Sequence, residues 1–182
     1  MTDILERAEN FAKRAHLGHV RFNKAQEPYV NHLAEVASLV NASGGSKEEI
    51  AAAWLHDAVE DTPTTLSQIR EEFGSSVAEI VDGLTDPLEF SGMPMNERKV
   101  LQARRVHNKS DGVKRVKISD QISNVRCVFV DPPVKWDDRK CLIYTETAFL
   151  IAMECGHISM FLNAEFRKAY NNAVRKYNIP AD

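Results

Sequence analysis

The sequence predicts an all-α fold. Apolar residues recur every three and four positions along most of the chain, whereas period-two alternation is scarce and neither a strand–helix–strand rhythm nor a phosphate-cradling glycine loop is found. Hydrophobic residues at 43% and charged residues at 27% are ordinary globular values, which exclude disordered and fibrous classes. At 182 residues the chain is long enough for one well-cored domain and short for two, so we expect a single domain over 1–182.

Each helix expected in the first half combines apolar spacing with residues that start or stop helices. Thr2 can cap the first helix, and Gly18 is placed to end it. A second helix should open near Pro28 and end at a glycine pair. Ser46 and Glu49 have the spacing of a capping box, which predicts the start of the third helix. The apolar stripes of the five expected helices span 4–15, 30–40, 50–55, 66–73 and 77–84.

In the second half, prolines and polar caps again mark the boundaries. Residues 87–94 contain a glycine and two prolines, so we expect a loop there before helical residues resume over 96–108. Ser110 or Asp111 can cap a long helix that runs through Val130 until two prolines stop it. The remaining apolar positions predict two final helices, around 137–155 and 157–177.

The net charge and the cysteine content limit the cellular compartments and the classes of binding partner that we expect. The formal net charge of −3 gives no reason to expect a nucleic-acid or membrane partner. Three cysteines are an odd number without the spacing of a metal motif, which favours a reducing compartment over a disulfide framework. The first residues lack the basic start and long apolar run of a signal peptide, and no stretch approaches membrane-spanning length. We therefore expect a cytoplasmic protein.

The stretch His56-Asp57-Ala58-Val59-Glu60-Asp61 concentrates metal-ligand and acid–base side chains. If the third helix continues through it, Glu60 lies four residues after His56 and Asp61 four after Asp57, so each pair shares a face. Side chains at that spacing have Cβ atoms roughly 5 to 6 Å apart. One pair could then hold a metal ion while the other handles a bound water. This one helix could supply half of an active site.

A carboxylate cluster on a helix is also commonly a solvated face, but the surroundings of this run favour the metal site. The run follows an apolar stretch, which draws at least one member inward, where an uncompensated charge is costly. The helix should stop before Pro63. Glu60 and Asp61 then lie at a helix C-terminus, where the macrodipole disfavours bare anions and a nearby cation stabilises them.

A metal ion held by His56 and Asp57 alone would be weakly bound, so further ligands must come from elsewhere. His32 lies inside the second expected helix among apolar residues, where a packed core histidine is the alternative. Asp120 lies between two isoleucines, where a solvated aspartate is the alternative. Asn124 follows Asp120 at i+4 and shares its face, so both should point into one pocket. The candidate ligands occur in the order His, His-Asp, Asp.

This order is the metal signature of the HD-domain phosphohydrolases, and the chain resembles the hydrolase domain of RelA/SpoT-type proteins over roughly residues 8–150. Stand-alone members of that family are the small alarmone hydrolases. The most specific part of the resemblance is His-Asp followed by Glu-Asp-Thr, which generic HD proteins lack. The resemblance implies an HD-domain helical bundle of about eight to ten helices. The stretches that carry it are AHLGHVR (15–21), PYVNH (28–32), AWLHDAVEDT (53–62), FG (73–74) and VKISD (116–120).

The resemblance also implies a metal centre. His32, His56, Asp57 and Asp120 match the ligands of a single divalent ion, which is usually manganese in this family. Mixed imidazole and carboxylate ligation also suits iron or zinc. The implied cofactor is therefore Mn²⁺, with other divalent transition metals as alternatives.

Five further positions match the reacting and nucleotide-binding residues of the family. Glu60 and Asp61 match the pair that positions and deprotonates the attacking water. Arg21 matches a residue of the nucleotide pocket, where a guanidinium can stack on a base or bind phosphate in a fork. Asn124 matches a polar contact to the ribose or phosphate region, and Tyr144 matches a tyrosine of the substrate wall.

Several positions depart from the family pattern. The family commonly has Gln at the position of His19, a basic residue at Phe22 and Pro at Leu33, and its Leu-Ala-Asp-Lys-Leu run is Ile-Ser-Asp-Gln-Ile at 118–122. None of these changes removes a ligand or the Glu-Asp pair. The loss of a basic residue at position 22 leaves the arrangement of base and phosphate open.

The activity implied by the resemblance is manganese-dependent hydrolysis of the 3′-pyrophosphate of guanosine tetra- or pentaphosphate (ppGpp, pppGpp), giving GDP or GTP and pyrophosphate. The expected partner is a small nucleotide, and the oligomeric state stays open. Two alternatives remain: the same site acting on adenosine alarmones (ppApp type) or on the 2′-phosphate of NADPH, and a non-catalytic nucleotide-binding HD module. Four basic residues could steer the pyrophosphate or form solvated surface, namely Arg98, Lys99, Arg104 and Arg105.

Overall fold

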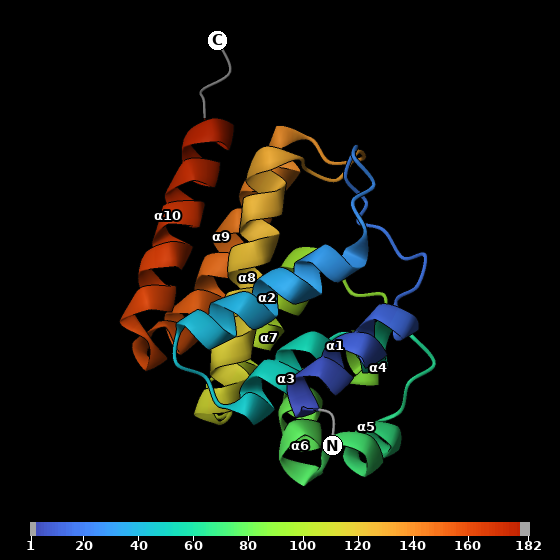
Figure 1. Cartoon of the computed structure of the whole chain (residues 1–182). Helices are drawn as coiled ribbons and strands as arrows, with labels where there is room; N and C mark the ends of the chain where they lie inside the picture. Colours follow the sequence, from blue (N-terminus) through green and yellow to red (C-terminus); the bar gives the residue numbers. More distant parts are fainter. Residues whose placement is uncertain (1–2, 179–182) are drawn as a thin grey trace.

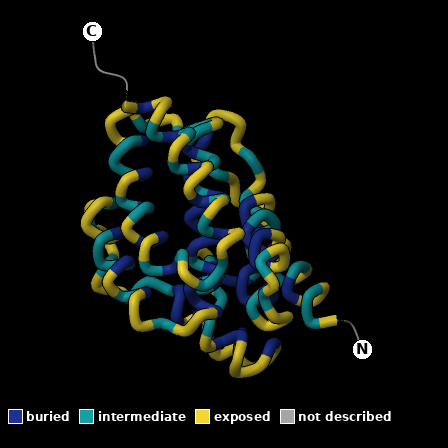
Figure 2. Tube along the Cα trace, turned by 90° about the vertical axis from the view of Figure 1, so that its left-hand side faces the viewer, coloured by how far each residue is buried: buried dark blue, intermediate teal, exposed yellow. Residues whose placement is uncertain are grey.

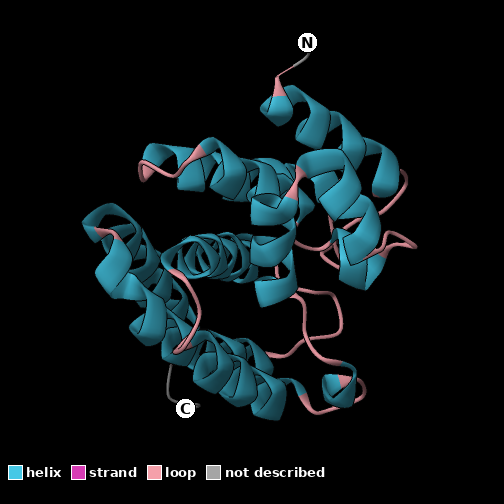
Figure 3. Ribbon diagram, turned by 90° about the horizontal axis from the view of Figure 1, so that it is seen from below, coloured by secondary structure: helices cyan, strands magenta, loops and turns pink. Residues whose placement is uncertain are grey.

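The computed structural model describes residues 3–178, and within this range the chain is a bundle of helices joined by loops (Figure 1). No strand forms in the described part of the chain, as Figure 3 shows, and only two isolated bridges occur, Val20 with Pro28 and Asn23 with Pro133. The predicted all-α class is confirmed. The helices are α1 (Ile4–Ala15), α2 (Tyr29–Ala42), α3 (Lys47–Leu55), α4 (Ala58–Asp61), α5 (Leu66–Phe73), α6 (Ser75–Leu84), α7 (Met95–Val106), α8 (Asp111–Val130), α9 (Asp138–Cys155) and α10 (Met160–Tyr177), with 3-10 helices η1 (Leu88–Phe90) and η2 (Gly156–Ile158).

Polar caps begin several helices where local sequence predicts them. Ser46 and Glu49 form the predicted capping box at the start of α3. Ser110, one of the two candidates, caps α8 through its hydroxyl. A second capping box, Thr65 with Gln68, starts α5 and was not predicted. The predicted cap Thr2 lies outside the described residues, and α1 begins after Asp3.

The helix predicted to run unbroken through the His56–Asp61 stretch is in fact two helices. α3 ends at Leu55, and His56 and Asp57 form a turn before α4. Nδ1 of His56 lies 2.8 Å from the carbonyl oxygen of Ala53, so the imidazole is hydrogen-bonded to a backbone carbonyl in the last turn of α3. Asp57 and Asp61 nevertheless keep the predicted i,i+4 spacing of a helix, because Asp61 N donates to Asp57 O at 2.9 Å.

Two boundaries in the second half also differ from the predictions. The expected loop over 87–94 contains the 3-10 turn η1. The last helix begins at Met160 instead of residue 157, because η2 occupies the intervening turn and Ser159 provides the cap, accepting a bond from Leu162 N.

Helix α8 is the centre of the fold and packs against α2, α3, α6, α9 and α10 (Figure 1). Twelve of its 20 residues are buried, on all sides of the helix. Figure 2 shows that buried residues gather where the helices face one another. One core cluster joins α2 to α7–α10, and a second joins α1 to α3, α5 and α6. A helix buried all round has no solvent face for its polar residues, so Asp120, Gln121 and Ser123 must find partners inside the protein. Across residues 3–178, no helix has the length and apolar character needed to span a membrane.

Candidate metal centre and active-site cleft

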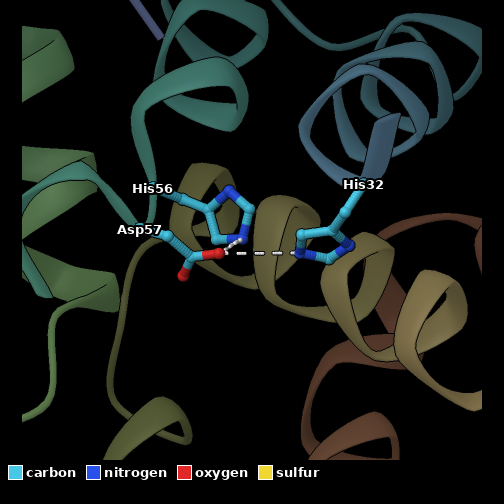
Figure 4. Close-up of side chains that lie close together, drawn as sticks. All are labelled: His32, His56 and Asp57. Carbon is cyan, nitrogen blue, oxygen red and sulfur yellow. Dashed lines mark ion pairs between the residues drawn. The ribbon is translucent and has the colours of Figure 1, made fainter. Parts of the chain in front are cut away.

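Two imidazoles and a carboxylate converge between α2 and the turn that joins α3 to α4. Figure 4 shows His32, His56 and Asp57 pointing toward one another. Oδ2 of Asp57 lies 3.0 Å from Nε2 of His56 and 3.6 Å from Nε2 of His32. One ligand atom from each residue lies within 4.8 Å of the others, and both imidazoles are buried. These three residues form the tightest group of candidate ligands.

Asp120 approaches the same point from α8. Its Oδ1 lies 3.5 Å from Nε2 of His32 and 3.9 Å from Nε2 of His56. Asn124 donates a hydrogen bond to this Oδ1, and Gln121 donates one to Oδ2 at 2.8 Å. The four residues predicted to bind a metal therefore lie together, although they come from three separate parts of the chain.

The hydrogen bonding of His56 suits a metal ligand. A carbonyl oxygen can only accept, so the contact to Ala53 O requires the ring proton on Nδ1 and leaves the Nε2 lone pair facing the two aspartates. Nε2 is buried without a hydrogen bond, because its 3.0 Å contact with Asp57 lacks hydrogen-bond geometry. A buried polar atom without a partner is costly. Two imidazoles beside two carboxylates fit a divalent transition metal, which would satisfy Nε2.

Without a cation, His56 and Asp57 stabilise each other as an ion pair. Burial disfavours the imidazolium, but the charges of Asp57 and Asp120 outweigh burial and raise the pKa of His56 to about 9. Burial likewise disfavours the Asp57 carboxylate, but the imidazoles of His56 and His32 hold the pKa of Asp57 well below its usual range. A bound cation would replace the imidazolium proton as the partner of this carboxylate.

Glu60 and Asp61 follow on α4 and face the adjoining space. Glu60 lines the same cavity as His56 and Asp57, and its Oε1 accepts a hydrogen bond from Asp86 N at 2.6 Å. Asp61 lines a neighbouring cavity. Burial raises the pKa of both carboxyl groups, and the charge of Asp57 adds to the effect. A carboxylate with a raised pKa is a better proton acceptor, as a general base requires.

The cleft consists of two adjoining cavities of opposite character. The first contains the candidate ligands His56, Asp57 and Asp120 and is also lined by Arg98, Lys99 and Lys117, with Nζ of Lys117 3.8 Å from Oδ2 of Asp120. The second is largely apolar, with Phe22 and Trp136 in its wall. Tyr29, Asn124 and Tyr144 line both cavities, so these residues form a wall that the two cavities share.

The three predicted nucleotide-binding residues all line this cleft. Nη2 of Arg21 donates to Oδ1 of Asn124 at 2.6 Å, and the amide of Asn124 donates in turn to Asp120. Tyr144 lies beneath Lys99, whose Nζ is 4.1 Å from the ring centre. Phe22 is 87% exposed and stands at the rim of the apolar cavity.

Several residues of the cleft were not singled out by the sequence, among them Tyr29, Gln121, Lys117 and Trp136. The hydroxyl of Tyr29 donates to Asp57 at 2.7 Å. Tyr29 lies three residues before His32, and this i,i+3 spacing could have indicated it. Gln121 accepts a hydrogen bond from Lys99 at 2.6 Å, and Lys99 is only 5% exposed. Of the other basic residues considered, Arg104 is exposed and Arg105 bonds the carbonyl of Thr85, so neither lines the cavity of the candidate ligands.

Known proteins resemble this chain in both sequence and fold. The sequence model of the HD domain matches residues 8–144. The guanosine-3′,5′-bis(diphosphate) 3′-pyrophosphohydrolase MESH1 of Homo sapiens is 35% identical over 147 residues, which is 80% of this chain and 80% of the relative. The guanosine-3′,5′-bis(diphosphate) 3′-pyrophosphohydrolase of Haemophilus influenzae is 40% identical over 121 residues, 63% of this chain and 17% of that protein.

Among solved structures, the one described as a metazoan ortholog of SpoT that hydrolyses ppGpp superimposes with a TM-score of 0.86. The match covers 94% of this chain and 96% of that chain at 24% sequence identity, so it shows a shared fold. A Listeria monocytogenes protein superimposes with a TM-score of 0.65 over 79% of this chain and 99% of its own, also at 24% identity.

Proposed function

The chain belongs to the HD-domain family that includes the guanosine-3′,5′-bis(diphosphate) 3′-pyrophosphohydrolases, and from this premise we propose that it hydrolyses the 3′-pyrophosphate of ppGpp and pppGpp. The products would be GDP or GTP and pyrophosphate. One observation carries the proposal: the side chains of His32, His56 and Asp57 converge beside a charged cavity, and an apolar cavity adjoins it. We propose one hydrolase domain over residues 1–182, acting in the cytoplasm, where Cys127, Cys141 and Cys155 would stay reduced.

The metal ligands we propose are His32, His56, Asp57 and Asp120. When bound, a divalent cation lowers the pKa of water and offsets negative charge on phosphate oxygens. We propose manganese because a set that is half carboxylate suits it, although imidazole ligands also accept zinc and iron.

Glu60 and Asp61 are the proposed proton acceptors of the reaction. Water attacks the phosphorus attached to the ribose 3′ oxygen, and a carboxylate receives a proton of the water. The bond between the 3′ oxygen and phosphorus breaks, and the departing oxygen takes up a proton to become the 3′ hydroxyl of GDP or GTP. The hydrogen bond from Asp86 N restrains one oxygen of Glu60 and leaves the other free to face the cavity. The raised pKa of each carboxyl group supports this role.

The charged cavity would hold the phosphates and the apolar cavity the base. Arg98, Lys99 and Lys117 line the same cavity as the acidic residues and supply the cations that a pyrophosphate requires. The rings of Tyr144 and Trp136 pack against each other at an angle of 50° with centres 5.1 Å apart, which offers an aromatic wall to a purine.

A second candidate function keeps the site and changes the substrate. Phe22 is exposed at the rim of the apolar cavity, in place of the basic residue common in the family. An apolar wall discriminates weakly between purines, because it makes few hydrogen bonds to their edges. Adenosine alarmones and the 2′-phosphate of NADPH are therefore further candidate substrates.

The test is pyrophosphate release from ppGpp by the purified protein with Mn²⁺. We expect release by the wild type and a loss of at least about 100-fold in Asp61→Asn, since general base catalysis contributes that much or more. Glu89→Gln, at an exposed position of η1, is the matched control and should keep full activity.

The same assay with ppApp, and release of inorganic phosphate from NADPH, rank the substrates. No pyrophosphate release from ppGpp across several divalent metals would reject the guanine assignment. Tight nucleotide binding without turnover of any of these compounds would instead support the non-catalytic HD module.

A further inference from the structure

A chain of side chains leads from His32 away from the metal centre to the last helix. Nδ1 of His32 lies 2.8 Å from the hydroxyl of Ser123, which lies 2.6 Å from Oε2 of Glu35. The other oxygen of Glu35 accepts from Nη1 of Arg126 at 2.7 Å. Nη2 of Arg126 donates to Glu165. The chain therefore joins α2, α8 and α10 behind one candidate ligand.

The direction of each hydrogen bond follows from the chemistry of the groups. Glu35 pairs with a guanidinium, and an ionised carboxylate only accepts hydrogen bonds. Ser123 has one hydroxyl proton, which must therefore go to Glu35. The oxygen of Ser123 must then accept from His32, which places the imidazole proton on Nδ1 and the lone pair on Nε2. That Nε2 is the atom that faces Asp57 and Asp120.

We propose that Ser123 and Glu35 are positioning residues, which hold His32 in the tautomer and orientation that a metal ion requires, and that Arg126 and Glu165 hold Glu35 in turn. This inference rests on the metal site of the proposed function. Partners of this kind behind a metal-bound histidine typically contribute 10- to 100-fold in metal affinity.

The contribution of each of these side chains to metal affinity should decrease from Ser123 to Arg126, because their exposure to solvent increases. Ser123 is 1% exposed, so water cannot replace its hydroxyl when it is removed. The Glu35 and Arg126 side chains are 36% and 34% exposed, and an ion pair at such exposure is worth less than a buried one. We therefore expect the largest loss of metal affinity at Ser123, a smaller one at Glu35 and the smallest at Arg126.

The two candidate histidine ligands differ in this respect. The Nδ1 proton of His56 goes to the backbone carbonyl of Ala53, which no side-chain substitution removes. The orientation of His32 depends on side chains alone, and its support extends to Glu165 on α10, beyond the residues that the HD-domain sequence model matches.

The test measures Mn²⁺ binding to the metal-free full chain, from the electron paramagnetic resonance of free Mn²⁺ during titration. We expect Ser123→Ala to raise the Kd about 10- to 100-fold and Ser123→Thr, which keeps a hydroxyl, to restore most of the affinity. Ser119→Ala is the matched control, because Ser119 is equally buried on α8 but donates to Arg115 O instead of contacting a ligand. It should bind Mn²⁺ like the wild type.

Glu35→Gln keeps the test decisive if Ser123→Ala does not fold. The amide of Gln can donate to Ser123, which frees the hydroxyl proton for His32 and permits the wrong imidazole tautomer. We expect a Kd raised several-fold, with circular dichroism and unfolding free energy in EDTA close to wild type. Wild-type affinity in folded Ser123→Ala or Glu35→Gln would overturn the positioning role alone. No Mn²⁺ binding by the wild type would overturn the metal site of the proposed function as well.

Discussion

Tyr29 donates a hydrogen bond to the same oxygen of Asp57 that faces both candidate histidine ligands, with Oη 2.7 Å from Oδ2. Burial and the charge of Asp57 raise the pKa of Tyr29 far above its ordinary value, so the phenol stays protonated at any physiological pH. The ring itself is held by a stacking contact with His16, at 5.3 Å between ring centres. Tyr29 thus fixes the orientation of the carboxylate without carrying charge.

Removing only this hydroxyl, in Tyr29→Phe, should weaken metal-dependent hydrolysis about tenfold or more, because Asp57 loses the donor that orients it. The ring stays in place, so circular dichroism should not change. Tyr170→Phe, in the aromatic cluster with Phe149 and Phe166, is the control. Equal turnover by Tyr29→Phe and wild type, measured over a range of Mn²⁺ concentrations, would contradict the role.

Lys99 should bind phosphate, and its charge should depend on pH in the neutral range. Burial lowers the pKa of Lys99 to about 7, so its ammonium form is depleted as pH rises above that value. The KM for ppGpp should therefore increase above about pH 7 in the wild type. Lys99→Met should raise the KM about tenfold at pH 6, as expected for loss of a charge-assisted hydrogen bond worth about 1.5 kcal/mol or more.

The contribution of Lys99 is isolated by measuring the KM for ppGpp as a function of pH in Lys99→Met and in the wild type. Between pH 6 and pH 8 the KM of Lys99→Met should change less than that of the wild type. Lys168→Met removes an exposed lysine of α10 and should leave the profile unchanged. Parallel profiles for wild type and Lys99→Met would show that another group causes the pH dependence.

His16 should make the protein sensitive to acid. It is 3% exposed, neither ring nitrogen has a hydrogen-bond partner among the described residues, and burial lowers its pKa from 6.5 to about 4. Between these values the unfolded chain binds a proton that the folded protein excludes, so stability falls as pH drops from 6.5 towards 4. The loss should be on the order of 2 kcal/mol.

The variant His16→Phe has no proton to bind and should lose less stability over the same pH range. The measurement is the free energy of unfolding in urea at several pH values, taken as the difference between variant and wild type. The carboxylates titrate in both proteins and cancel in that difference. His157→Asn, at an exposed histidine, should follow the wild type, and an identical pH dependence in His16→Phe would refute the assignment.

Gly83 lets α6 approach α8 closely. A Cβ at this position would lie 2.5 Å from Cγ2 of Val113, which is closer than real contacts allow. Gly83→Ala gains up to about 1 kcal/mol of helix propensity, but overpacking typically costs about 1 to 3 kcal/mol. We therefore expect net destabilisation in urea unfolding. Adding Val113→Ala should relieve the clash, and a Gly83→Ala variant at least as stable as wild type would be inconsistent with this close packing.

Local signals explain which parts of the fold could be predicted. Ser46 and Ser110 cap their helices by bonds that span three residues, so neighbouring sequence is enough to find them. The break between α3 and α4 accompanies a contact of Asp57 with His32 on another helix, at 3.6 Å. No pattern within 50–62 contains that information, and the helix was wrongly predicted to continue.

Some residues of the candidate site could likewise be predicted from the sequence, and others could not. Adjacent acidic residues and histidines mark Asp57 and Glu60, and family resemblance indicates His32 and Asp120, whose roles stay predictions. The contact of Tyr29 with Asp57 joins residues 28 positions apart, and that of His32 with Ser123 joins residues 91 positions apart. Hydrogen bonds at such separations follow from packing, which a single sequence does not reveal.

The proposed ligands of the cation come from distant parts of the sequence, and this has a consequence for protein synthesis. A nascent chain that has left the ribosome only as far as α7 already carries both imidazoles and Asp57, but it lacks Asp120 and the wall residue Tyr144. Domains generally fold as units during translation. The ability to capture a cation should therefore arise late, when α8 emerges and docks against α2, and a prematurely released N-terminal fragment would be inert.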